Sequence, residues 1–139
     1  MVRFSATDYV EGGWDQQQTN QVARWASELG ADLFDISSGG IVAGVKIPIG
    51  PGYQVPAAVR IRAETGVVTR AVGLITSARQ ANTIIADGQA DQVALARAIL
   101  DDPRWGWHAA DALGAEVHCP PQYARARPGS WRSVRDGNA

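Results

Sequence analysis

Arg97 is the residue of this sequence best placed to bind an anion. It follows Ala96 directly after a predicted strand and stands at the start of a short predicted helix. The free amides at a helix start attract negative charge, and a guanidinium can hold a phosphate through two hydrogen bonds. Alternatively, Arg97 pairs on the surface with Asp101 one helical turn later, which stabilises a helix only slightly. Spacing alone does not choose between these two interpretations.

Arg3 offers a second cationic group, within a strand pattern. It stands between Val2 and Phe4, so its side chain faces either the helix layer or the interior of a barrel. A buried guanidinium needs a partner, because an unpaired charge is costly to remove from water. An anionic ligand ring is one candidate partner, and an ion pair with Asp8 or Asp35 is the other.

Small residues follow two of the predicted strands, where they leave room for a bulky ligand. Residues 37–40 are two serines followed by two glycines, although an ordinary loop would have the same composition. Gly73 lies at the exit of the next strand, and its missing Cβ atom lets a ligand approach the backbone. We expect the amides of Gly73 and Leu74 to converge with those of Ala96 and Arg97 on one pocket.

The sequence shows no cluster typical of a catalytic or metal-binding site. His108 and His118 are not at metal-ligand spacing, and Cys119 is the single cysteine. One cysteine excludes an internal disulfide and favours a reducing, cytoplasmic setting. We therefore expect no metal site and no catalytic residue in this chain.

Composition excludes several classes of protein. The chain has 139 residues, of which 45% are hydrophobic, and its 13 basic and 14 acidic side chains give a net charge of −1. That balance argues against binding nucleic acid or a charged membrane surface. No apolar run approaches the roughly 18–20 residues of a membrane span. The length fits one domain and is too short for a closed (β/α)8 barrel of ~250 residues.

Strand and helix patterns alternate along the chain. The predicted strands are residues 2–5, 33–36 and 92–95, with a further strand in residues 67–75 that is broken by Gly73. The predicted helices follow N-terminal capping boxes at Asp15 and Ser77, run from Pro56 to about Thr65, and occupy residues 96–100 and 102–114. Residues beyond 114 look irregular. Because strands joined by helices must run parallel, the pattern predicts an α/β fold of four consecutive β/α units, half of a (β/α)8 TIM barrel.

Five blocks of this sequence, in order and spacing, resemble the old yellow enzyme family of NADH:flavin oxidoreductases, in its bacterial ene-reductase class. The blocks are residues 2–9, 35–40, 51–54, 71–75 and 96–103. The resemblance covers residues 2–125 and corresponds to the C-terminal half of the family's barrel. It implies a half-barrel domain at residues 1–125, made of the family's strands five to eight, and a disordered tail at 126–139.

The resemblance implies FMN as cofactor, NADPH or NADH as hydride donor, and an activated alkene as small-molecule substrate. The cofactor-binding residues that it implies are Arg3, Ser38, Gly39, Gly73, Leu74, Ala96 and Arg97. In the family, Arg3 would lie against the flavin ring, while Ala96 and Arg97 would hold the phosphate. Ala96 replaces a glycine that is usual in the family. Arg125 matches an arginine that reaches a neighbouring subunit's active site, which implies a homo-oligomer.

The first four β/α units of the family have no counterpart in this sequence. They carry the family's proton-donating tyrosine and its carbonyl-binding histidines. The activity is therefore expected of a full-length parent, with this chain a truncated part that is inactive alone. The alternatives are a non-catalytic half-barrel that binds FMN or another phosphate ligand, and a defunct remnant. Half a barrel should also expose an apolar sheet face that promotes self-association.

Overall fold

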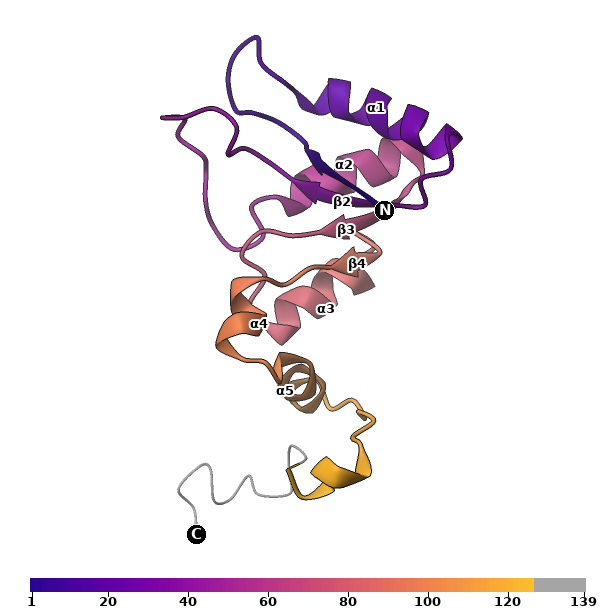
Figure 1. Cartoon of the computed structure of the whole chain (residues 1–139), viewed down its shortest axis with the longest axis vertical. Coiled ribbons are helices and arrows are strands. Elements are labelled where there is room, and N and C mark those ends of the chain that lie inside the picture. The colour runs from indigo at the N-terminus through magenta and orange to yellow at the C-terminus, as the bar shows by residue number, and fades with distance from the viewer. Residues whose placement is uncertain (127–139) are drawn as a thin grey trace.

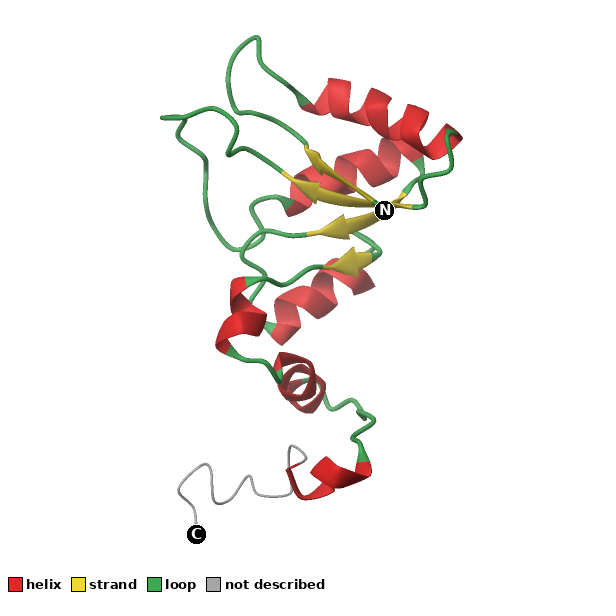
Figure 2. Ribbon diagram, viewed as in Figure 1, coloured by secondary structure: helices red, strands yellow, loops and turns green. Residues whose placement is uncertain are grey.

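The computed structural model describes residues 1–126, in which strands and helices alternate (Figure 2). The strands are β1 (Val2–Ser5), β2 (Leu33–Ser37), β3 (Val68–Ala71) and β4 (Gln92–Val93). The helices are α1 (Gln16–Glu28), α2 (Val55–Thr65), α3 (Ala78–Ala86), α4 (Arg97–Asp101) and α5 (Trp105–Ala112), followed by the 3-10 helix η1 (Pro121–Ala126). Apart from Ala126, the tail expected at residues 126–139 lies outside the described residues.

The four strands form one parallel sheet in the order β1-β2-β3-β4. Phe4 pairs with Ile36, Ile36 with Ala71, and Ala71 with Val93, so each strand is aligned with its neighbours in sequence. Helices α1, α2 and α3 lie on one side of the sheet (Figure 1). The α/β fold of four consecutive β/α units is therefore confirmed.

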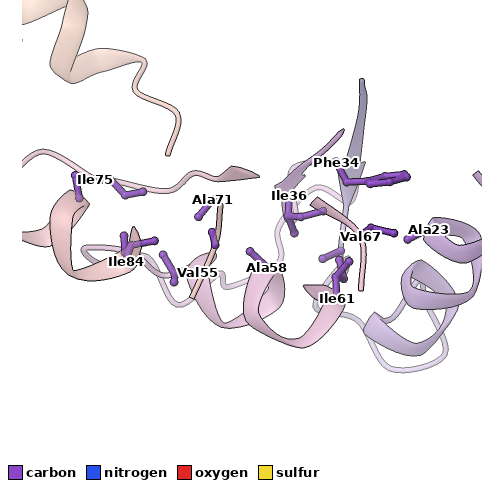
Figure 3. Close-up of a cluster of buried hydrophobic side chains, with 13 residues drawn as sticks. Ala23, Phe34, Ile36, Val55, Ala58, Ile61, Val67, Ala71, Ile75 and Ile84 are labelled. Atoms are coloured by element: carbon purple, nitrogen blue, oxygen red, sulfur yellow. The ribbon is translucent and has the colours of Figure 1, made fainter. Parts of the chain in front are cut away.

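The hydrophobic core lies between this sheet and its helices (Figure 3). Phe34 and Ile36 of β2, with Ala58 and Ile61 of α2, are fully buried. The Phe34 ring also stacks on Phe4, with ring centroids 5.4 Å apart and planes 7° apart. Burying each large side chain contributes about 1.5–3 kcal/mol, so this layer fixes the strands on which the loops at their ends are built.

The predicted start of α1 and end of α2 are confirmed. Asp15 accepts a hydrogen bond from the Gln18 amide at 2.9 Å, and the Gln18 side chain accepts one from the Asp15 amide at 3.0 Å. Pro56 lies in the first turn of α2, where its missing N–H costs nothing. Gly66 ends that helix at a φ of +70°, a conformation that glycine adopts without strain.

The capping box predicted at Ser77 is wrong. Ser77 precedes α3 in an extended conformation, but its side chain makes no capping hydrogen bond. Gln80, the expected second half of the box, packs instead against the turn at Gly52, where its Nε2 lies 2.9 Å from the position of an added Cβ. A tertiary contact has therefore replaced the local one.

Strands β3 and β4 are shorter than predicted. The C-terminal region contains more regular structure than predicted. Strand β3 stops because Gly73 and Leu74 have φ values of +115° and +51°, which a strand cannot accommodate. Helix α5 begins at Trp105, after a turn in which the Asp102 carboxylate accepts the Arg104 amide at 3.0 Å. Beyond it, η1 forms where no structure was predicted. No helix among residues 1–126 is long and apolar enough to cross a membrane.

The uncovered face of the sheet is polar at its centre, so the expected apolar face is wrong. Because Phe34 and Ile36 point toward the helices, the alternation of a strand turns Asp35 to the other face. The strand register aligns Asp35 with Arg3 on one side and Arg70 on the other, and Arg70 in turn with Gln92. Arg70 donates to the Gln92 side chain at 2.7 and 3.1 Å.

Candidate cofactor site

A cavity of about 210 Å³ lies at the carboxyl ends of the strands. Six of the seven predicted cofactor-binding residues line it: Arg3, Ser38, Gly73, Leu74, Ala96 and Arg97. The segments after β3 and β4 therefore meet at one cavity, as their position at the same edge of a parallel sheet requires. Ser37, Tyr53, Gln54 and several small or apolar residues complete the lining.

Gly39, the seventh predicted residue, does not line the cavity. Its amide donates to the Thr7 carbonyl at 2.8 Å, which ties the loop after β2 to the loop after β1. A Cβ at Gly39 would lie 2.7 Å from Ile47 Cδ1 and 3.3 Å from the Tyr9 ring. Packing against these two side chains accounts for a glycine at this position.

Arg3 forms the ion pair with Asp35 that was one of its two predicted alternatives. Its Nη1 lies 2.6 Å from Asp35 Oδ2, and the register of β1 and β2 places the two residues side by side. The Arg3 side chain remains 58% exposed, whereas that of Asp35 is 6% exposed. A buried carboxylate thus anchors a guanidinium whose other donors remain accessible from the cavity, so the pair leaves the ligand role of Arg3 open.

Asp35 has hydrogen-bonding capacity that this pair does not use. Its Oδ1 atom is buried and has no hydrogen-bond partner among the described residues. Such an atom carries a desolvation cost of about 1–3 kcal/mol, so proteins rarely leave one without a reason. Its partner Arg3 lines the cavity together with Ser37 and Ser38.

Strained backbone marks the wall of the cavity that follows β3. Leu74 has a φ of +51°, which a side chain with a Cβ adopts at a cost of about 1–3 kcal/mol. Gly73, with a φ of +115°, packs on Gln54: an added Cβ would lie 2.9 Å from its Oε1. Backbone strain of the kind found at Leu74 concentrates at ligand sites, whereas Gly73 adopts its positive φ without strain.

Arg97 begins α4 on the opposite wall. It is exposed and forms no ion pair with Asp101 or with any other residue in the described part of the chain. Ala96 caps this short helix without a side-chain hydrogen bond. The guanidinium is therefore free to bind an anion, and the predicted surface pair with Asp101 is absent.

Two lining residues, Gln54 and Tyr53, and one supporting residue, Tyr9, escaped prediction. The Tyr9 hydroxyl lies 2.8 Å from Ser38 Oγ, and Gln54 Nε2 donates to the Ser38 carbonyl at 3.1 Å. Block 51–54 belongs to the resemblance, but its residues carry no charge and no recognisable catalytic spacing. The useful signal was a glutamine at a helix start, where a shorter capping side chain is usual.

The remaining candidate residues lie away from the cavity. Arg125 is exposed on η1, which the chain trace places well away from the sheet (Figure 1). His108 is exposed on α5, with Nδ1 2.6 Å from Asp102 Oδ2. Within residues 1–126, no three side chains of histidine, cysteine, aspartate or glutamate are grouped to hold a metal ion.

A second ion pair, between Arg62 and Asp91, lies at the amino ends of the strands, on the opposite side of the sheet from the cavity. Hydrogen bonds from Arg62 lower the pKa of the Asp91 carboxyl, with burial opposing the shift and the Thr69 amide supporting it. Asp91 accepts Arg62 Nε at 3.1 Å and the Thr69 amide at 2.9 Å. This pair joins α2, β3 and the start of β4 at their far ends, so it serves stability rather than the cavity.

Comparison with known proteins agrees with this geometry. The chain is 42% identical over 126 residues to an NADPH dehydrogenase of Listeria innocua, and 46% identical over 125 residues to one of Halalkalibacterium halodurans. It is 45% identical over 131 residues to an NADPH dehydrogenase of a Geobacillus species. The alignments cover 91%, 90% and 94% of this chain.

The chain spans little more than a third of the length of these relatives, 37% in each of the three. Four parallel β/α units in sequential order, in a chain that spans only part of its relatives, have the fold of a partial TIM barrel. Residues 1–116, which include all of β1 to α5, match the family described as NADH:flavin oxidoreductase / NADH oxidase. The chain therefore belongs to the NADH:flavin oxidoreductase / NADH oxidase family.

Proposed function

We propose that this chain provides the FMN-binding C-terminal part of an NAD(P)H oxidoreductase of the ene-reductase class. The observation that carries the proposal is the meeting of two backbone segments, 73–74 and 96–97, with Arg3 at one cavity. Family membership and the names of the relatives as NADPH dehydrogenases support the same assignment.

The residues around the cavity suit the parts of FMN. Arg97 supplies an unpaired guanidinium for the phosphate, and the backbone at Ala96 supplies the start of a helix beside it. Gly73 contributes backbone to the cavity lining, and its missing Cβ leaves room for the Gln54 side chain behind it. Ala96 and Ala98 keep the phosphate end free of bulky side chains.

When bound, FMN supplies hydride transfer, from NADPH or NADH to an activated alkene. In our proposal, Arg3 would hold the ring end of the cofactor, and its positive charge would stabilise negative charge that develops there. The buried Asp35 holds that guanidinium at its surface position through the 2.6 Å contact. Ser38, fixed by Tyr9 and Gln54, forms the wall facing Gly73.

We propose further that this chain is inactive by itself. Ene reduction needs an acid to protonate the substrate carbon and donors to polarise its carbonyl. Neither histidine lines the cavity, and the Tyr9 hydroxyl is hydrogen-bonded to Ser38. Tyr53 does line the cavity, but its position is not the one that the family uses for its acid. The missing groups would come from the family's other four β/α units. Arg125, on the separate η1 segment, would serve a neighbouring copy in a homo-oligomer.

An FMN titration of the purified chain tests the cofactor site. Quenching of flavin fluorescence should give saturable binding, and Arg97→Ala should weaken it about 10- to 150-fold, the equivalent of ~1.5–3 kcal/mol for a charge-assisted contact. Arg60→Ala, on the exposed surface of α2, is the matched control and should leave affinity unchanged. Riboflavin, which lacks the phosphate, should not distinguish Arg97→Ala from the wild type. Equal FMN affinity of the two arginine variants would refute the phosphate assignment.

A turnover assay tests the proposed inactivity. The chain is supplied with excess FMN, NADPH and cyclohexenone, and oxidation of NADPH is followed by its absorbance. We expect no alkene-dependent oxidation. A rate of ~1 per second or more, within the ordinary enzymatic range, would show that the catalytic groups are present in this chain.

A further inference from the structure

A buried amide side chain connects two walls of the cavity. Gln54 is 4% exposed and lines the cavity from the turn that precedes α2. It occupies the position before the helix, yet its side chain makes no capping hydrogen bond. Residues at this position usually turn their side chains back onto the helix, so the Gln54 amide is directed elsewhere.

The Gln54 amide holds the loop that follows β2. Its Nε2 donates to the Ser38 carbonyl at 3.1 Å and lies 3.2 Å from Ser37 Oγ, which together use both amide hydrogens. Ser38 is itself joined to the loop after β1 through the 2.8 Å contact with the Tyr9 hydroxyl. One side chain thus secures the wall on which Ser37 and Ser38 lie.

The same turn holds the loop that follows β3. The Gly52 amide donates to the Gly73 carbonyl at 2.7 Å. Gly73 also lies flat against Gln54, since an added Cβ would be 3.1 Å from Gln54 Cβ and 3.2 Å from its Cγ. The Ser38 wall and the Gly73 wall therefore meet the same residue from two sides.

We propose that Gln54 is a positioning residue that sets the separation of the Ser38 and Gly73 walls and so the fit of the cavity to a flavin. An apolar side chain of equal length would fill the same space but make no hydrogen bonds. The role of the amide is therefore to orient the loop through its hydrogen bonds to Ser37 and Ser38, in addition to filling space. This inference rests on the proposed FMN site for its ligand, but the coupling of the two walls stands on the contacts themselves.

The coupling is tested without ligand by amide hydrogen exchange in wild type and Gln54→Met. Methionine keeps the length of the side chain and removes both donors. Exchange should accelerate about tenfold at the amides of Gly39 and Gly52, which report on the two loops. The Gly66 amide, bonded to Arg62 at the far end of α2, should be unchanged. Unchanged exchange at both loops, or acceleration throughout the chain, would overturn the proposal.

The consequence for the cofactor is tested by FMN affinity relative to wild type at pH 8 and pH 5. Gln54→Met should bind FMN about tenfold more weakly at both pH values, as expected for the loss of two neutral hydrogen bonds. Gln54→Glu should be weakened at pH 8, where its carboxylate faces the Ser38 carbonyl. It should recover at pH 5, where burial promotes protonation and restores a donor. Gln17→Met, on the exposed face of α1, is the control and should match the wild type.

The outcomes separate the two proposals. Absence of FMN binding by the wild type would refute the proposed function, and the exchange measurement would still decide the role of Gln54. FMN binding that is equal in wild type, Gln54→Met and Gln54→Glu would refute the positioning role while leaving the FMN site in place. A loss in Gln54→Glu that is the same at pH 5 and pH 8 would also refute it, because a purely steric defect has no such pH dependence.

Discussion

Gly73→Ala is the substitution whose cost the structure defines best. The residue has a φ of +115°, and an L-residue held there costs about 1–3 kcal/mol. The new Cβ would also lie 2.9 Å from Gln54 Oε1 and 3.1 Å from Gln54 Cβ. Forcing such an overpacked contact costs about 1–3 kcal/mol more. We therefore expect the free energy of unfolding to fall by about 2–6 kcal/mol, out of the ~5–15 kcal/mol typical of a domain.

Two other glycines separate the backbone strain from the contact. Gly66 has a φ of +70°, and a Cβ there would meet nothing within 4 Å, so Gly66→Ala should cost only about 1–2 kcal/mol. Gly50 has no positive φ and open space around it, so Gly50→Ala should stay within about 0.5 kcal/mol of wild type. Urea unfolding followed by tryptophan fluorescence measures all three. If Gly73→Ala and Gly66→Ala are equally destabilised, the contact with Gln54 contributes nothing and the reasoning fails.

Three other substitutions test the elements that support the site. Asp91→Asn should destabilise the fold at neutral pH, because the lowered pKa of this carboxylate reflects its bonds to Arg62. Since that stability is present above the ordinary carboxyl pKa and lost as pH falls through the lowered one, the difference from wild type should shrink below about pH 3.9, in urea titrations at each pH. Asp15→Ala should cost about 1 kcal/mol through loss of the box with Gln18, seen as a lower Tm. Phe34→Ala should cost about 3–5 kcal/mol in urea unfolding, and an effect under about 1 kcal/mol would contradict its place in the core.

Local signals predicted the fold because they agree with the tertiary structure at most positions. The box at Asp15 forms as written, and Gly66 ends α2 as its conformational freedom suggests. Ser77 shows where such reasoning stops. Its expected partner Gln80 finds a contact with the turn at Gly52, which lies far away in the sequence. No short stretch of sequence includes both possible contacts of Gln80, so local patterns could not predict which one forms.

Sequence predicted those residues of the candidate site that carry a charge or lack a side chain. Arg97 and Gly73 are recognisable by residue type and by position after a strand, and Arg3 by its charge within a strand. The partner of Arg3 depended on the strand register, which places Asp35 beside it and which composition does not specify. Gln54 could not be predicted from sequence for a different reason. An uncharged amide acquires its role only when Ser38 and Gly73 are brought to it by the sheet.

The strand order has a consequence for how the chain acquires its structure. Every strand pairs with its neighbour in sequence, so each β/α unit can add to the previous one without waiting for a distant segment. Pairing between neighbours in sequence keeps each loop as short as a parallel sheet allows, which limits the entropy cost of closing it. As the chain leaves the ribosome, β2 would dock on β1 before β3 is made, and the cavity would be completed last, when Arg97 emerges. A cofactor could therefore stabilise the completed fold but could not guide the early steps of folding.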